Sequence, residues 1–149
     1  EALLEKQSYY KNYLFGIKKL EPIAGIPDLL AEIKNAGAKL GLASSSNRDF
    51  IEMVLMNLGI MDYFDMIVSG DEVKKSKPDP EIFLKAAGNL KVNPEDCLVI
   101  EDSRHGVKAA ILAGMKCIGF HNPNSGAQDL SLADTVVHSI TEINIKDYL

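Results

Sequence analysis

Few residues of the kinds that mark disulfide, metal or membrane proteins occur in this sequence. Its 149 residues include two cysteines, three histidines and no tryptophan. Cys97 and Cys117 stand in apolar, strand-like runs, where a thiol acts as a small hydrophobic group, so neither a disulfide scaffold nor a zinc site is indicated. No apolar run approaches the length of a membrane span and no signal peptide opens the chain, which favours a cytoplasmic protein without a membrane partner.

An excess of basic residues is also absent. The chain has 16 lysines and arginines against 21 aspartates and glutamates, a formal net charge of -5. We therefore expect no nucleic-acid partner, because binding to nucleic acid needs a basic patch. His105, His121 and His138 are scattered along the chain, and we assign none of them to a metal.

The sequence does contain alternating strand and helix patterns. With 46% hydrophobic and 25% charged residues, the chain suits one domain with a buried core. Short apolar runs predict strands at residues 38–43, 65–69, 97–101, 115–120 and 134–137. Apolar spacing and capping residues predict helices at residues 26–36, 48–58, 80–90 and 104–113. Residues 1–18 are also predicted to be helical, with apolar side chains spread too evenly for one narrow stripe, so this helix would need partners on more than one side. This alternation indicates βαβ units and therefore an α/β fold with a mostly parallel sheet.

The stretch from Cys97 to Val107 carries the first candidate site. A continuous apolar run, typical of a strand buried on both faces, leads directly into Glu101 and Asp102. Two adjacent carboxylates repel one another, and Mg²⁺ is a cation that binds at such oxygen-rich positions while keeping waters and a substrate phosphate. An equally open alternative is that Asp102 or Ser103 caps the following helix beside a solvated Glu101.

Two further loops follow predicted strands. Ser44, Ser45 and Ser46 follow the first strand, and Lys77 follows the second. Loops at the carboxyl ends of parallel strands emerge at one edge of a sheet, so these groups can converge with the carboxylate pair. Hydroxyl and backbone N–H groups, a cation and carboxylates together suit a phosphate and a Mg²⁺ ion. Taken singly, each has an ordinary alternative, since serine loops cap helices and a lysine before proline is usually solvated.

In this order the motifs resemble those of the haloacid-dehalogenase-like (HAD) superfamily, in its beta-phosphoglucomutase-like phosphatase and mutase branch. The matching segments are Leu42–Ser46, Lys77–Phe83 and Val99–Gly106. The resemblance extends from about residue 22 to the C-terminus, and it implies a Rossmann-like, three-layer α/β/α core. It divides the chain into the end of a helical cap domain at residues 1–20 and a partial core at residues 21–149.

The resemblance also implies roles for individual residues. Ser44 would bind the transferred phosphoryl group, and Ser45 would contribute its backbone N–H. Lys77 would pair with the nucleophile and the phosphate. Asp102 would ligate Mg²⁺ directly. Glu101 would be a further ligand, or it would contact the ligands without binding the metal itself.

One part of the family pattern is missing. The first family motif, an Asp-x-Asp after the first strand, carries the nucleophile and the general acid or base, and nothing in this sequence supplies it. In the family strand order 5-4-1-2-3, that strand would lie between the strands at 38–43 and 97–101. We therefore expect an N-terminal segment of the same polypeptide to complete the sheet and to carry the nucleophile.

The resulting hypothesis is a monomeric, Mg²⁺-dependent phosphatase or sugar-phosphate mutase that acts on a small phosphorylated substrate through an aspartyl-phosphate. A non-catalytic relic that binds a phosphate ligand or a partner protein is the alternative. A flavodoxin-like or receiver-like module would fit the sheet, but it would leave the segment from Lys77 to Pro80 unexplained.

Overall fold

The computed structural model describes residues 20–149, so the helix predicted at residues 1–18 lies outside the described residues. The α-helices described are α2 (Ile26–Asn35), α3 (Arg48–Leu58), α4 (Glu81–Leu90) and α5 (Arg104–Leu112). The strands described are β1 (Gly41–Ala43), β2 (Met66–Val68), β3 (Leu98–Glu101), β4 (Lys116–Phe120) and β5 (Thr135–Val137). The predicted alternation of helices and strands is confirmed for this part of the chain.

The ends of the elements follow from their local chemistry. Asn47 caps α3, because its side-chain oxygen accepts a hydrogen bond from the Phe50 backbone N–H at 2.9 Å. The same helix ends at Gly59, whose φ of 70° is a left-handed conformation that glycine adopts at little cost. Strand β1 is shorter than the predicted 38–43. The backbone N–H of Leu40 donates to the Asp65 carboxylate and not to a carbonyl of a neighbouring strand, so the strand begins only at Gly41.

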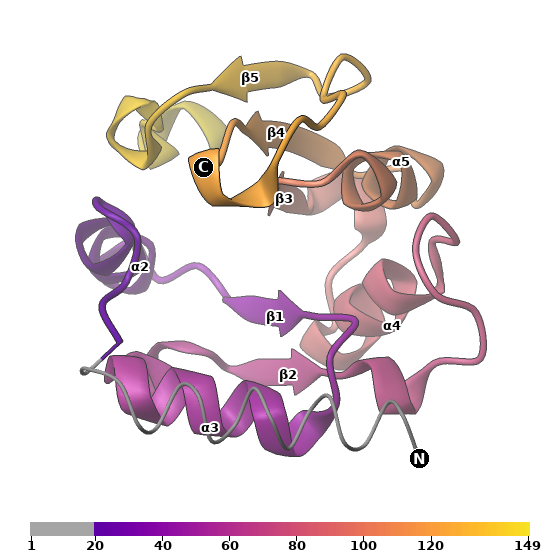
Figure 1. The fold of residues 1–149 in the computed structure, drawn as a ribbon, viewed down its shortest axis with the longest axis horizontal. Helices are drawn as coiled ribbons and strands as arrows, with labels where there is room; N and C mark the ends of the chain where they lie inside the picture. The colour runs from indigo at the N-terminus through magenta and orange to yellow at the C-terminus, as the bar shows by residue number, and fades with distance from the viewer. Residues whose placement is uncertain (1–19) are drawn as a thin grey trace.

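The strands form two separate parallel sheets (Figure 1). One contains β1 and β2, and the other has the order β3-β4-β5. Parallel pairing aligns Leu42 with Ile67 in the first sheet and Ile100 with Ile118 in the second. Strands β1 and β3 are the facing members of the two sheets and do not pair with each other. Each of these two strands thus has a strand partner on one side within the described residues.

Helices cover both faces of the strands, which gives the predicted three-layer arrangement. Val99 and Cys117 point into a core formed with α4 and α5. Leu98, Ile100 and Ile118 alternate with them and point into the opposite core, which includes residues of α2 and of the C-terminal 3-10 turns. Helix α3 packs on the side of α2, against β1 and β2. Because α4 contacts both β1 and α5, this helical layer joins the two sheets.

Burial differs between the inner strand β4 and the two facing strands. Residues 117–120 of β4 are all buried. All three residues of β1 are only half-buried, and Val99 alone is buried within β3. An apolar strand in the middle of a sheet is normally buried on both faces, so β1 and β3 have the exposure of sheet edges.

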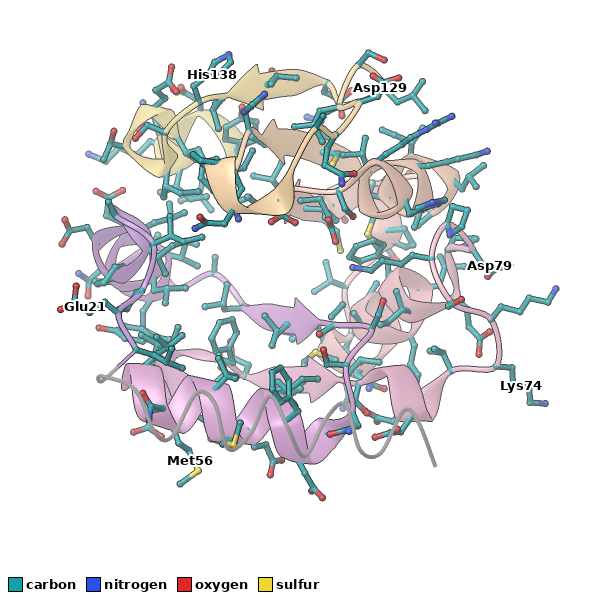
Figure 2. The ribbon with its side chains drawn as sticks, viewed as in Figure 1. Glu21, Met56, Lys74, Asp79, Asp129 and His138 are labelled. Atoms are coloured by element: carbon teal, nitrogen blue, oxygen red, sulfur yellow. The ribbon has the colours of Figure 1, made fainter. Side chains whose placement is uncertain are left out.

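Glu21, Lys74 and Asp129 lie at the periphery, with their side chains outside the packed layers (Figure 2). No helix within residues 20–149 is long and apolar enough to cross a membrane.

The free thiols are those of a half-buried Cys97 and a buried Cys117, and Cys117 has the core position that its apolar surroundings predict.

Candidate functional site

The loop after β1 is held by the loop after β2. The Ser44 N–H donates to the Val68 carbonyl at 3.0 Å, and the Gly70 N–H donates to the Ser46 carbonyl at 2.8 Å. A Cβ atom at Gly70 would lie only 2.2 Å from the Ser45 carbonyl oxygen, so the two backbones approach in a way that only glycine permits. Within the loop, the Ser46 N–H donates to the Ser44 hydroxyl oxygen at 3.2 Å. Ser44 is half-buried and Ser45 is exposed.

A charged network lies beneath this loop. Arg48 donates to the Ile67 carbonyl at 2.7 Å and to the Glu72 carboxylate at 2.9 Å. The same carboxylate accepts hydrogen bonds from the backbone N–H and the hydroxyl of Ser69, a fully buried residue. The Ser69 backbone hydrogen bond is the main reason that the pKa of Glu72 lies below its ordinary value, and Arg48 contributes in the same direction.

Lys77 connects the ends of the two sheets. Its Nζ donates to Glu101 Oε1 at 2.5 Å, at the end of β3, and to the Ala43 carbonyl at 3.4 Å, at the end of β1. The ammonium group also lies 4.7 Å from the centroid of the Phe83 ring, a favourable cation–π position. The side chains of Lys77 and Glu101 are each only 11% exposed.

The predicted convergence at the sheet edge is therefore confirmed for Lys77 and Glu101. Within residues 20–149, Lys77 forms no direct bond with Ser44 or Asp102. Among the described residues Lys77 bonds the carbonyl of Ala43 rather than the hydroxyl of Ser44, and its ion pair is with Glu101 and not with Asp102. The reason is geometric, because Glu101 already lies between the lysine and the start of α5.

The second oxygen of Glu101 is also occupied. Oε2 accepts hydrogen bonds from the Asp102 N–H at 3.1 Å, the Ser103 N–H at 3.2 Å and the Ser103 hydroxyl at 3.1 Å. The Ser103 hydroxyl oxygen accepts the Gly106 N–H at 3.0 Å and so caps α5. The cap alternative is thus correct for Ser103, but Glu101 is not solvated. Both carboxylate oxygens of Glu101 are thus bonded to neighbouring groups of the chain.

Asp102 has different partners. Its Oδ2 accepts a hydrogen bond from Asn122 Nδ2 at 2.9 Å and another from Ser125 Oγ at 2.5 Å. Both donors lie in the loop that follows β4, which was not among the loops predicted to form the site. The signal that could have found them is their position, since this loop also begins at the carboxyl end of a parallel strand.

The described residues fit a Mg²⁺ site only in part. Within residues 20–149, no group of three or more histidine, cysteine, aspartate and glutamate side chains is arranged to hold a metal ion. Asp102 keeps one oxygen, Oδ1, to which none of these residues donates a hydrogen bond. A half-buried carboxylate oxygen is a suitable ligand for Mg²⁺, which uses one or two protein carboxylates together with waters and phosphate.

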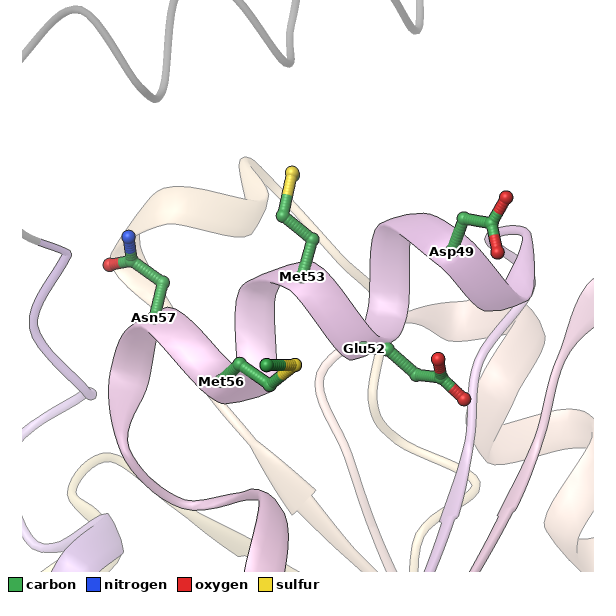
Figure 3. Close-up of a pocket in the computed structure, with 5 residues that line it drawn as sticks. All are labelled: Asp49, Glu52, Met53, Met56 and Asn57. Atoms are coloured by element: carbon green, nitrogen blue, oxygen red, sulfur yellow. The ribbon is translucent and has the colours of Figure 1, made fainter.

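A surface pocket lies elsewhere, on the outer face of α3. It is lined by Asp49, Glu52, Met53, Met56 and Asn57 (Figure 3). All five side chains come from one helix, and none of them is among the residues at the strand ends, such as Ser44, Lys77 and Glu101. This pocket is therefore separate from the candidate site.

The described fold and site define a Rossmann-like α/β protein whose polar side chains gather at the carboxyl ends of parallel strands. The model of the haloacid dehalogenase-like hydrolase family matches residues 2–120. The chain belongs to this family, and the resemblance found in the sequence is confirmed.

Individual relatives point to the beta-phosphoglucomutase-like branch. The chain is 39% identical over 139 residues to beta-phosphoglucomutase of Bacillus subtilis, covering 91% of this chain and 59% of that protein. It is 34% identical over 128 residues to hexitol phosphatase B of Escherichia coli, covering 85% and 58%. A crystal structure of beta-phosphoglucomutase from Clostridium difficile superposes with a TM-score of 0.84 at 36% identity, covering 96% and 61%. The chain thus spans less than two thirds of each of these relatives.

Proposed function

We propose that this chain is part of a Mg²⁺-dependent phosphoryl-transfer enzyme that acts on a small phosphate ester, either as a phosphatase or as a sugar-phosphate mutase. The observation that carries the proposal is the contact of Lys77 with the ends of both β1 and β3. It brings a cation next to the serine loop on one side and the carboxylate pair on the other. Relatives named as a phosphoglucomutase and a phosphatase support the same reaction class.

Each of these residues would have a distinct role in phosphoryl transfer. The Ser44 hydroxyl and the Ser45 N–H would accept the phosphoryl oxygens, and Lys77 would neutralise the charge that develops on them. Glu101 would keep the Lys77 ammonium at the edge through their ion pair. Asp102 would supply a ligand to Mg²⁺, and the chemistry that a bound Mg²⁺ adds is further neutralisation of phosphoryl charge.

The nucleophile would lie outside this chain, on a strand that enters between β1 and β3. This part of the proposal is supported by the lack of pairing between β1 and β3 and by their half-exposed apolar residues. Neighbouring strands lie about 4.8 Å apart, so one inserted strand would separate β1 from β3 by about 9.6 Å. An aspartate at the carboxyl end of that strand would face Lys77 and could form the aspartyl-phosphate.

Two substitutions in the natural protein that carries this chain test the reaction. Lys77→Ala and Asp102→Asn should each lower turnover of sugar phosphates at least 10-fold, since a charge-assisted contact is worth about 1.5–3 kcal/mol. Lys91→Ala, at an exposed position, is the control and should have little effect. Asp102→Asn should also weaken the dependence of turnover on Mg²⁺. Wild-type turnover and Mg²⁺ titration in both variants would contradict the proposal, and phosphate binding without turnover in the parent would favour the non-catalytic alternative.

A separate experiment tests the inserted strand. Residues 1–149 produced alone should be insoluble or molten and inactive, because β1 and β3 would expose unpaired edges. Co-expression with a segment that contains an apolar strand ending in Asp-x-Asp should restore solubility and phosphatase activity. A soluble monomer of residues 1–149 that melts cooperatively, with β1 bonded directly to β3, would overturn this part of the proposal.

A further inference from the structure

The loop after β4 holds Asp102 in one orientation. Asn122 uses its side-chain oxygen to accept the Asn124 N–H at 3.0 Å. This fixes the amide, because the nitrogen must then point the other way, where it donates to Asp102 Oδ2 at 2.9 Å. The Ser125 hydroxyl donates to the same oxygen at 2.5 Å. Two donors from one short turn therefore bind a single oxygen of Asp102.

The loop is in turn tied back to α5. Gln128 donates its side-chain nitrogen to the Ser125 carbonyl at 3.1 Å. Its side-chain oxygen accepts the N–H of Arg104, the first residue of α5, at 3.0 Å. The hydrogen bonds from Asp102 through Ser125 and Gln128 to Arg104 thus form a ring that the backbone from Asp102 to Arg104 closes. Such a ring keeps the two donors in place when Asp102 binds a ligand through its other oxygen.

We propose that Asn122 and Ser125 are positioning residues that hold Asp102 so that Oδ1 alone is offered to a divalent cation, which favours Mg²⁺ over Ca²⁺. The inference rests on the proposed Mg²⁺ function of Asp102. Its physical basis is the different demand of the two ions. Mg²⁺ requires near-octahedral geometry, to which a carboxylate bound through one oxygen is suited, whereas Ca²⁺ accepts carboxylates through both oxygens in a larger and more flexible shell.

Removing either donor frees Oδ2 and lets the carboxylate rotate. Groups that orient a metal ligand typically contribute about 10- to 100-fold to metal affinity. We therefore expect Ser125→Ala and Asn122→Ala to weaken Mg²⁺ binding by this factor. Binding of Ca²⁺ should weaken less, because both carboxylate oxygens become available to it. The preference for Mg²⁺ over Ca²⁺ should fall by about 10-fold.

The experiment measures dissociation constants of Mg²⁺ and Ca²⁺ in the natural protein, by competition with Mn²⁺ followed by electron paramagnetic resonance. Ser125→Thr keeps the hydroxyl and should retain the preference of the parent. Asn144→Ala is a matched control, because Asn144 likewise donates to an aspartate, Asp147, at 3.0 Å and accepts a backbone N–H within its own turn. It should change neither constant.

The possible results separate this inference from the function on which it rests. Parent-like Mg²⁺ and Ca²⁺ constants in Ser125→Ala and Asn122→Ala overturn the positioning role and leave Asp102 as a ligand. An equal loss of affinity for both ions, or a loss that Ser125→Thr shares, shows only damage to the loop and also overturns the role. Absence of Mn²⁺ binding in the parent, or its persistence in Asp102→Asn, overturns the proposed metal function itself.

Discussion

Gly106 gives the sharpest test of the site geometry. It lies in the first turn of α5, directly against the Glu101 side chain. A Cβ atom added there would lie 2.0 Å from Glu101 Cδ and 2.1 and 2.3 Å from the two carboxylate oxygens. These distances are far below van der Waals contact, so Gly106→Ala must displace the Glu101 carboxylate.

The expected cost follows from what Glu101 would lose. Its carboxylate accepts a hydrogen bond from Lys77 through one oxygen and three hydrogen bonds through the other. Hydrogen bonds to charged groups are worth about 1.5–3 kcal/mol each, and water recovers part of this loss once the carboxylate is displaced. Replacing a helical glycine by alanine gains about 0.5–1 kcal/mol. We expect Gly106→Ala to lower the free energy of unfolding by about 2–4 kcal/mol.

Gly88 is a matched control. It lies within α4, and a Cβ atom there would meet no atom within 4 Å beyond its chain neighbours and the backbone of its own helix. Gly88→Ala should therefore stabilise the protein by about 0.5–1 kcal/mol. Urea denaturation of the natural protein at neutral pH measures both effects on the same scale.

A double substitution identifies the cause. In a Glu101→Ala background the carboxylate is absent, so adding Gly106→Ala should cost nothing or should stabilise as Gly88→Ala does. The reasoning is refuted if Gly106→Ala stabilises the parent, or if its cost is the same with and without Glu101. Either result would mean that Glu101 does not occupy the space above Gly106.

Two further predictions concern titrating groups. Because the folded-state pKa of Glu72 is lowered, chiefly by the Ser69 N–H, this carboxylate stabilises the protein above its ordinary pKa, and the stabilisation is lost as the pH falls through the lower, folded-state value. Glu72→Gln should therefore reduce stability near neutral pH and have a shrinking effect in acid, measured by urea denaturation across pH; a constant difference would contradict this. Burial raises the pKa of Cys117 to about 12, and the charges of Glu101 and Asp134 add to the shift. At about pH 8, iodoacetamide should therefore alkylate the half-buried Cys97 before Cys117 in the folded protein. Mass mapping that finds equal rates would show that Cys117 is accessible.

The order and type of the elements were predictable because they depend on local patterns. Residues 48–58 carry a cap signal at Asn47 and a stop at Gly59, and the helix has those bounds. Strand β1 was overestimated, since the apolar run from residue 38 gives no sign that the Asp65 side chain would replace a strand partner at Leu40. An apolar run shows which residues are hydrophobic, but it does not show which residues of another segment will pair with them.

The site was predictable only where a residue type at a strand end carries the chemistry. Lys77 and Glu101 met that condition and lie together. Asn122 and Ser125 did not, because asparagine and serine are ordinary loop residues and their contact with Asp102 spans 20 and 23 positions of sequence. The sequence also left open which residue caps α5, and the hydroxyl of Ser103 takes this role while Asp102 bonds the loop after β4.

The supports around the candidate site belong to two separate sheets. The serine loop is fixed to the first sheet through Gly70 and through the network of Arg48 and Glu72. The carboxylate pair is fixed to the second sheet through its bonds to α5 and to the loop after β4. Each half is held by its own sheet, and Lys77 bonds the strand ends of both. One flexible side chain does not set the spacing of two sheets, so the alignment of the two halves also depends on helix α4, which contacts both β1 and α5.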